Sequence, residues 1–148
     1  MEKGYRLMRY WLMKSEPDAF GWDDLVAKGA AGEEWDGVRN YQARNNMRAM
    51  ELGDLAFFYH SQSDKAVVGI CEVIAAAHPD STTDDPRWEC VDVRAVKPLK
   101  HPVTLAMVKD DPRLQEMALV KTSRLSVQPV SPQEWQIICE MGGTDPQD

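Results

Sequence analysis

The sequence predicts an α+β domain in which a mostly antiparallel sheet, or partial barrel, carries short helices on its outside. Three long segments of strand character follow one another at residues 55–61, 66–77 and 88–96. Segments adjacent in sequence are usually neighbours in a sheet, so this order favours hairpin pairing. Segments with helical apolar spacing come before and after them. The 148 residues contain no repeat or internal linker, which fits one domain with a sizeable core.

Composition argues against a protein that binds nucleic acid broadly through charge. The net charge is −7, from 17 Lys and Arg against 24 Asp and Glu. The acids gather at residues 80–92, whereas residues 38–50 and 119–130 carry basic side chains without an acid. A local basic face is therefore compatible with the acidic total. No run approaches the roughly 18 apolar residues that a membrane helix needs, so we expect no membrane partner.

The three cysteines, Cys71, Cys90 and Cys139, are scattered and have no metal-ligand spacing. An odd, unpatterned set favours reduced thiols, and we therefore expect a cytoplasmic protein without metal or cofactor. Residues 1–8 are short and mixed, without the apolar centre of a signal peptide, and are interpreted as an N-terminal extension. Residues 142–148 are interpreted as a C-terminal tail.

The first elements are a strand and a helix. Residues 9–13 are apolar on both faces, which suits a central strand. Pro17 ends it, and residues 14–18 are expected to form a turn, or a polar strand end that points into a site. Residues 22–28 predict an amphipathic helix that Gly29 stops. Its inward side chains are expected to be Trp22, Leu25 and Val26.

The segment 35–46 follows a loop at 30–34 and is dense in aromatic, arginine and amide side chains. Asn40 is a suitable N-cap for a helix that begins at Tyr41. A buried stripe is then expected from Ala43, Met47 and Met50. Guanidinium and amide groups form paired hydrogen bonds with planar, anionic or heterocyclic ligands. The segment is therefore either a ligand site or an ordinary surface loop anchored by a buried Trp35.

The strand at 55–61 is expected to pair as a hairpin with the strand at 66–77. Alternation places Leu55, Phe57 and Tyr59 on one face, and Ala56, Phe58 and His60 on the other. Gly69 indicates a bulge or a close approach of another group to the backbone. A polar loop at 78–86 then leads to the antiparallel strand at 88–96.

The C-terminal part is expected to contain short elements. Thr104 is predicted to cap a helix at 105–109, and a second helix is expected from Asp111 to near Met117. Short extended pieces are expected at 119–121 and 125–130. Ser131 to Glu134 form a capping box for a last helix, ended by Gly142 and Gly143. Its apolar face is expected to hold Trp135, Ile138 and Cys139.

Four motifs occur in order along the chain. They are Tyr10–Pro17 (YWLMKSEP), Trp35–Tyr41 (WDGVRNY), Phe57–Ser61 (FFYHS) and Ser123–Pro129 (SRLSVQP). Together they closely resemble the EVE domain family, over residues 9–141. The resemblance implies a PUA-like fold, a small mixed pseudo-barrel with helices packed outside, related to the YTH domain.

The resemblance further implies a nucleic-acid reader that takes a flipped-out modified base into a pocket without catalysis. The base is expected to be a modified cytosine in DNA, such as 5-methylcytosine, or a modified base in RNA. Flipping a base costs a few kcal/mol, and stacking on an aromatic ring contributes roughly 1–3 kcal/mol. The expected base pocket contains Ser15, Glu16, Trp35, Asn40, Tyr41, Tyr59, His60 and Ser61. The cations expected near phosphates are Lys14, Arg39, Arg44, Lys121 and Arg124.

Two other functions fit parts of the sequence. One is binding of a small heterocyclic metabolite in the same pocket, which would not depend on salt. The other is a small nucleic-acid-modifying enzyme with His60 as general base and Glu16 or Asp36 as its partner carboxylate. No set of nucleophile, base and orienting group is visible in the sequence, which favours a binding protein. The bound base, the choice of DNA or RNA and the oligomeric state stay open.

Overall fold

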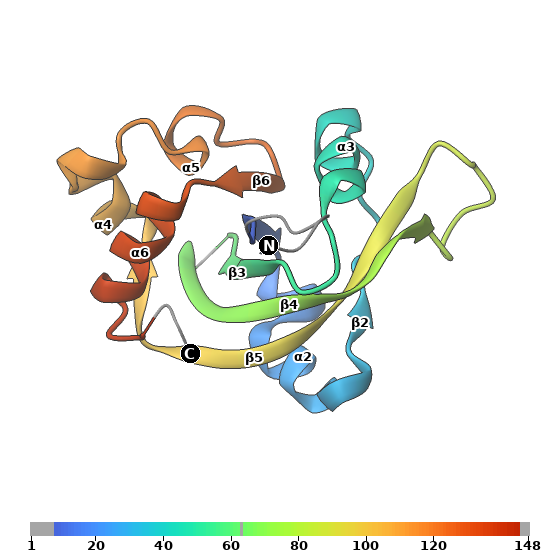
Figure 1. The fold of residues 1–148 in the computed structure, drawn as a ribbon, viewed down its shortest axis with the longest axis horizontal. Helices are drawn as coiled ribbons and strands as arrows, with labels where there is room; N and C mark the ends of the chain where they lie inside the picture. The colour runs from blue at the N-terminus through green and yellow to red at the C-terminus, as the bar shows by residue number, and fades with distance from the viewer. Residues whose placement is uncertain (1–7, 63, 146–148) are drawn as a thin grey trace, which may run out of the picture.

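A computed structural model describes residues 8–62 and 64–145; the outer parts of the expected extension and tail, residues 1–7 and 146–148, lie outside this description. Within it, six strands form one mixed sheet in the order β2–β5–β4–β3–β1–β6 (Figure 1). The strands are β1 (Tyr10–Ser15), β2 (Glu33–Glu34), β3 (Leu55–His60), β4 (Ala66–Pro79), β5 (Glu89–Thr104) and β6 (Val127–Val130). The predicted α+β class is confirmed.

Short helices surround this sheet. They are α1 (Pro17–Phe20), α2 (Trp22–Lys28), η1 (Gly29–Ala31), α3 (Tyr41–Ala49), α4 (Leu105–Asp110), η2 (Pro112–Leu114), α5 (Ala118–Lys121) and α6 (Pro132–Met141). Three predicted caps are confirmed, because Asn40, Thr104 and Ser131 each accept a hydrogen bond from the backbone of the first helical turn. The predicted stripe on α3 is also buried.

Strand β1 lies inside the sheet, one position from the edge strand β6 rather than at the centre, and is buried on both faces as the sequence predicts. Trp11, Leu12 and Met13 are buried, and β1 pairs on one side with β6, antiparallel, and on the other with β3. The β1–β3 pair is parallel, because the helices α1 to α3 carry the chain back across the sheet between the two strands. The β3–β4 and β4–β5 pairs are antiparallel, as predicted.

Two long strands, β4 and β5, curve across the molecule (Figure 1). Register shifts interrupt their pairing, and such bulges bend and twist a strand pair. The predicted end of the third strand at residue 96 is wrong, since β5 continues past Pro98 to Thr104. Pro98 is tolerated because it pairs with Gly69 at a register shift, and bulges are among the few places in a sheet that accept proline.

Several local predictions are corrected by the structure. The expected turn at 14–18 is the end of β1 followed by α1, and the loop at 30–34 contains η1 and β2. Residues 119–121 lie in helix α5 rather than in an extended piece, and the helix expected after Asp111 is only the short η2. Val26 is 49% exposed rather than inward. These pieces are one or two turns long, too short for apolar spacing to identify them.

The two faces of the sheet carry separate cores. One contains Trp11, Trp22, Trp35 and Phe58 and is covered by α2 and α3. The other contains Phe57, Tyr59 and Trp135 and is covered by α4, α5 and α6 (Figure 1). The predicted alternation along β3 is confirmed. Consequently, Trp35 and Tyr59, expected to form one aromatic wall, pack on opposite faces of the sheet.

Candidate functional site

A hollow of about 590 Å³ lies where the end of β1, helix α1 and the loop after β2 meet. We call it the Trp35 pocket. Its lining is formed by Lys14, Ser15, Glu16, Ala19, Phe20, Glu33, Glu34, Trp35, Asp36, Gly37, Val38, Arg39 and Ser126. Most of these residues come from the first two motifs, so the structure joins segments about twenty positions apart in one concave site.

Trp35 is held rigidly at the start of the pocket loop. Its backbone N–H donates to the carbonyl of Val91 at 2.8 Å. Its ring meets Phe58 edge to face, with centroids 5.5 Å apart, and only 7% of the residue is exposed. Phe58 makes the same kind of contact with Trp22, also at 5.5 Å. Trp35 is therefore part of the core and offers the pocket only a limited part of its ring.

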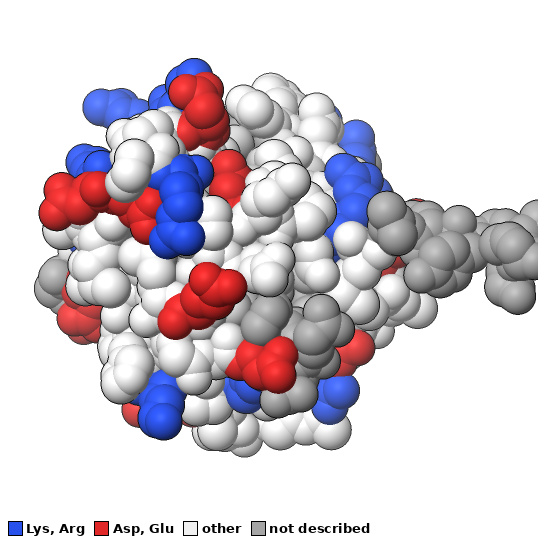
Figure 2. Space-filling view, turned by 60° about the vertical axis from the view of Figure 1, so that its left-hand side comes forward, with Lys and Arg blue, Asp and Glu red and all other residues white. Residues whose placement is uncertain are grey.

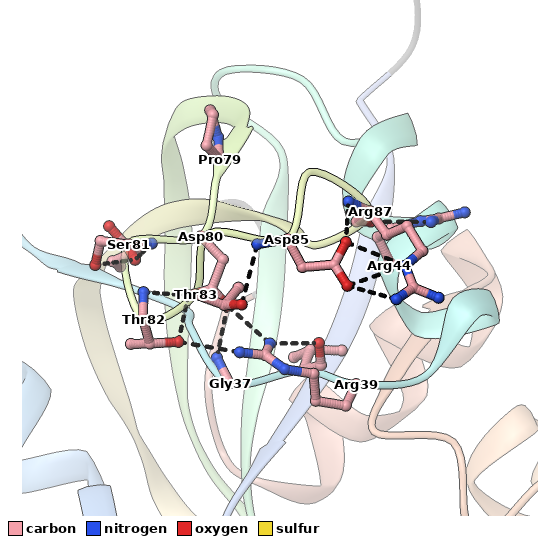
Figure 3. Close-up of polar contacts among 12 residues, drawn as sticks. Gly37, Arg39, Arg44, Pro79, Asp80, Ser81, Thr82, Thr83, Asp85 and Arg87 are labelled. Atoms are coloured by element: carbon pink, nitrogen blue, oxygen red, sulfur yellow. Dashed lines mark hydrogen bonds and ion pairs between the residues drawn. The ribbon is translucent and has the colours of Figure 1, made fainter.

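The rest of the loop is tied down by a buried carboxylate (Figure 3). Asp80 accepts a hydrogen bond from the Gly37 N–H at 2.9 Å and from the Arg39 guanidinium at 3.1 Å. The backbone and hydroxyl of Thr82 also donate to it. Burial alone would raise the pKa of Asp80, but these bonds outweigh burial and lower it to about 2. Gly37 has φ +80°, which favours glycine here.

The pocket is acidic on the side of β2. Burial raises the pKa of the Asp36 carboxyl, and the neighbouring carboxylates of Asp80, Glu34 and Glu33 raise it further. Burial also acts against ionisation of Glu34, but hydrogen bonds from the backbone and hydroxyl of Ser81 lower its pKa overall. The pocket thus offers carboxylate acceptors together with the Arg39 guanidinium.

A second, smaller hollow of about 230 Å³ adjoins the first at Lys14, which lines both. We call it the Tyr59 hollow. Its other lining residues are Tyr59, Ser61, Gln62, Lys65, Leu105, Leu119, Ser123 and Arg124. The Lys14 ammonium donates to the carbonyl of Ser123 and lies 5.7 Å from the centre of the Tyr59 ring. Burial lowers the pKa of Lys14, and burial raises that of Tyr59.

The site residues predicted from the sequence do not all lie in one hollow. Lys14, Ser15, Glu16, Trp35 and Arg39 come together in the Trp35 pocket. Tyr59, Ser61 and Arg124 line the Tyr59 hollow with Lys14. Lys121 lies apart from both: it lines a separate hollow beside β6 and pairs with Glu116 at 2.8 Å.

Three further predicted pocket residues have other partners. The Asn40 side chain accepts from the Ala43 N–H at 2.9 Å, as the cap of α3. The His60 Nε2 accepts from the Trp22 N–H, and its Nδ1 lies 3.1 Å from Asp64. Tyr41 lies on the outer surface of α3 and stacks on Trp88. None of the three lines the Trp35 pocket or the Tyr59 hollow.

Some lining residues escaped the sequence analysis as site candidates. Val38 and Ser126 lie inside the motifs, so their position could have suggested them. Asp36 was considered only for the enzyme alternative. No sequence pattern pointed to Phe20, because its place in the pocket depends on the short helix α1, which the sequence did not predict.

One cluster within the described residues has the side chains for a metal ion. Glu34, His78 and Cys90 each place one possible ligand atom within 4.8 Å of the others. However, the two imidazole nitrogens of His78 face acceptors, Asp92 Oδ1 at 2.7 Å and the Pro79 carbonyl at 3.0 Å. The hydrogen bond with Asp92 raises the pKa of His78, and both ring nitrogens already have other partners, which argues against a metal ligand here.

The charged surface is mixed. Figure 2 shows acidic and basic side chains interspersed around a broad uncharged area, without one continuous basic face. Any contact with a polyanion on this face would therefore use a few local cations rather than a general field. None of the described helices combines the length and apolar character that a membrane crossing requires.

The family model of the EVE domain matches residues 9–141. The chain belongs to the EVE domain family. A relative of this EVE domain, thymocyte nuclear protein 1 of mouse, is 38% identical over 97% of this chain and 77% of its own length. That relative is named as a nuclear protein, so the cytoplasmic location expected here stays a prediction. A crystal structure of a protein from Agrobacterium tumefaciens is 57% identical, with TM-score 0.91, and covers 92% of this chain and 94% of its own.

Another solved structure is the human THYN1 protein in complex with DNA that contains 5-methylcytosine. It is 35% identical to this EVE domain, covers 93% of this chain and 99% of its own, and has a TM-score of 0.84. A YTH domain from Zygosaccharomyces rouxii has a TM-score of 0.55 at 17% identity, covering 91% of this chain and 86% of its own, which shows a shared fold alone. The fold relationship expected from the sequence is therefore confirmed.

Proposed function

We propose that this EVE domain is a reader of modified bases that binds a flipped-out base in the Trp35 pocket and does not catalyse a reaction. The base we propose is a modified cytosine in DNA. The observation that carries the proposal is the Trp35 pocket, a concave site with an aromatic ring, carboxylates and an arginine. The human relative, which binds DNA containing 5-methylcytosine, supports the choice of ligand.

The chemistry of the pocket suits a cytosine. Its volume of about 590 Å³ lies within the usual range of small-molecule sites, roughly 300–1,000 Å³. Carboxylates accept hydrogen bonds from the N4 amino group of cytosine, and Glu16 and Asp36 are the candidates. A 5-methyl group needs an apolar wall, which Trp35, Phe20 and Val38 would supply.

Cations at the mouth would hold the backbone on either side. Lys14 lines both hollows, Arg39 lines the Trp35 pocket and Arg124 lines the Tyr59 hollow. Base flipping costs a few kcal/mol and aromatic stacking contributes roughly 1–3 kcal/mol per base. Hydrogen bonds to the base edge and these phosphate contacts would therefore decide whether binding is favourable.

The contacts of His60 support a binding function over an enzymatic one. A general base needs a free lone pair within reach of the proton that it removes. The lone pair of Nε2 accepts the Trp22 N–H at 3.1 Å, and Nδ1 faces Asp64. His60 therefore connects β3 to the start of α2 and is not directed into the Trp35 pocket.

The test compares two tryptophans with matched environments. Trp35 and Trp22 are each 7% exposed and each meet Phe58 at 5.5 Å, but only Trp35 lines the pocket. We expect W35F to lower affinity for DNA containing 5-methylcytosine about tenfold, since part of the stacking surface is lost. W22F should leave that affinity unchanged. Alanine is unsuitable at Trp35, because truncating a buried Trp costs about 3–5 kcal/mol of stability.

Fluorescence titration measures the affinity of both variants for matched duplexes that carry cytosine or 5-methylcytosine. Equal loss in W35F and W22F would place Trp35 outside the pocket that reads the base. Binding of the free nucleoside without binding of any duplex would instead favour the metabolite function. A mass change of the oligonucleotide during incubation would contradict the absence of catalysis.

A further inference from the structure

Planar side chains form a continuous series on the surface beside the Trp35 pocket. The Arg39 guanidinium lies over the Trp88 ring at 5.6 Å, and Trp88 stacks on Tyr41 with centroids 5.1 Å apart and planes at 22°. The Arg44 guanidinium lies over Tyr41 at 4.9 Å. We call these four residues the Arg39–Arg44 ladder. Arg87 adds a hydrogen bond to the Tyr41 hydroxyl at 3.1 Å.

The ladder is continuous with the candidate base site. Arg39 belongs to both, because it lines the Trp35 pocket and contacts the Trp88 ring. The series then runs from the pocket loop across the β4–β5 connection to helix α3. In Figure 3, Arg87 of this connection lies next to Arg44 of helix α3, and Arg39 reaches the same connection from the pocket loop. A strand that leaves the pocket past Arg39 would meet the ladder next.

The ladder is exposed, and one of its two arginines has no carboxylate partner in the described part of the chain. Tyr41 is 50% exposed, although it is a large aromatic residue. Arg39 pairs with Asp80, and Arg87 pairs with Asp85. The contacts found for Arg44 within the described part of the chain are with an amide, a carbonyl and an aromatic ring, and not with a carboxylate. The ladder therefore offers planar groups together with the positive charge of Arg44.

We propose that the Arg39–Arg44 ladder binds the nucleotides that flank the flipped base, an inference that rests on the proposed function. A base that leaves the duplex exposes the faces of its neighbours. Unstacked bases bind to aromatic rings and to the planes of arginine guanidinium groups. Because the ladder's members already stack on one another, the parts open to a base are the half-exposed Tyr41 and the Arg39 and Arg44 guanidinium groups at its two ends, and Arg44 adds a cation for a neighbouring phosphate.

A purely structural role is the competing explanation, since the ladder also joins α3 to the β4–β5 connection. The chain provides a matched control for it. Arg48 of α3 pairs with Glu89 at the start of β5, so it links the same elements without belonging to the ladder. R48A should remove one such link and leave the aromatic surface intact.

The experiment measures two ligands with each variant. One is the free nucleoside 5-methyl-2′-deoxycytidine, which can fill only the pocket, and the other is a duplex with one 5-methylcytosine. We expect Y41A and W88A to lower duplex affinity about tenfold or more and to leave nucleoside affinity unchanged. R48A should change neither affinity. Y41A provides a second readout if W88A lowers stability, because Tyr41 is already half exposed.

The outcomes separate this proposal from the proposed function. Unchanged duplex affinity in both ladder variants would overturn the ladder proposal alone. Equal losses for nucleoside and duplex, or the same loss in R48A, would assign the ladder a structural role. If ladder variants weaken a duplex that binds equally with or without the methyl group, the ladder stands and the reader function falls. A wild-type protein that binds neither ligand would overturn both.

Discussion

At the scale of single residues, the carboxylate of Asp80 has the largest structural effect on the candidate site. It is 2% exposed and accepts hydrogen bonds from Gly37, Arg39 and Thr82. A buried charge is stable only when it is paired and hydrogen-bonded, and this one is both. Gly37 and Arg39 lie about forty positions away in sequence, so Asp80 fixes the pocket loop to the β4–β5 connection.

Asp80 should make stability depend on pH in the acid range. Its pKa of about 2 in the folded protein lies below the 3.8 of an unperturbed Asp carboxyl. Its contribution is therefore present above pH 4 and lost as the pH falls toward 2, by about 2 kcal/mol in total. We expect D80N to lower stability at pH 7 and to flatten the dependence of Tm on pH between 4 and 2.

Thermal unfolding followed by circular dichroism between pH 7 and 2 measures this effect. E140Q, at an exposed position near the end of α6, is the control and should retain the wild-type pH profile. If Tm of D80N depends on pH between 4 and 2 as in the wild type, the pKa of Asp80 is not lowered in the folded protein.

The residue scale also shows the limits of sequence motifs. Asn40 was predicted both as a helix cap and as a reader of the base, and its side-chain oxygen is used by the cap. His60 and Tyr41 belong to two of the motifs and were predicted as pocket residues. Their contacts, with the Trp22 N–H and the Trp88 ring, lie outside the Trp35 pocket. A motif gives residue types in order, whereas the contacts of each side chain depend on elements distant in sequence.

At the scale of elements, the packing of α2 on β4 depends on one glycine. A Cβ built on Gly69 would lie 2.5 Å from the ring of Trp22. Gly69 also pairs with Phe58, next to a register shift. The sequence predicted a bulge or a close approach at this position, and the structure contains both. The absence of a side chain lets the Trp22 ring lie directly on the strand.

G69A should therefore displace Trp22 and α2 from the sheet. The rigid, buried ring cannot move aside without loosening its contact with Phe58, so we expect a loss of about 1–3 kcal/mol of stability. Urea unfolding measures the loss, and near-ultraviolet circular dichroism reports the tryptophan environment. V26A, on the exposed side of the same helix, should be nearly neutral. A stable G69A with an unchanged tryptophan signal would contradict this account of the packing.

At the scale of the whole molecule, the curved sheet separates two cores and places two hollows on either side of Lys14. The acidic total charge and the mixed surface in Figure 2 leave few cations for a nucleic acid. Binding should therefore be only moderately sensitive to salt. Four phosphate contacts, from Lys14, Arg39, Arg44 and Arg124, would give a slope of log affinity against log salt of about −3.6.

R124A should weaken binding to all duplexes alike and reduce the magnitude of that slope by about one. R113A is the control, since Arg113 pairs with Asp111 on η2 and lines none of the three hollows described above. Titrations at several salt concentrations give the salt slopes of R124A and R113A. A slope in R124A equal to that of the wild type would place Arg124 outside the interface.

The sequence by itself determined the α+β class, the caps at Asn40, Thr104 and Ser131, the burial of β1 on both faces and the alternation along β3. These features depend on local spacing and on hydrogen bonds within one turn or one strand, which the order of residues specifies directly. The four motifs also indicated the family, because their order and spacing extend over nearly the whole chain.

Only the tertiary structure decided which of these residues meet. Strand alternation places Phe58 and Tyr59 on opposite faces, but only the positions of the helices show which face carries the Trp35 pocket. The Arg39–Arg44 ladder and the Asp80 contacts join segments about forty residues apart, through curved strands whose bulges change the register. Local patterns do not encode such contacts, because they depend on how the whole sheet bends and which surfaces it brings together.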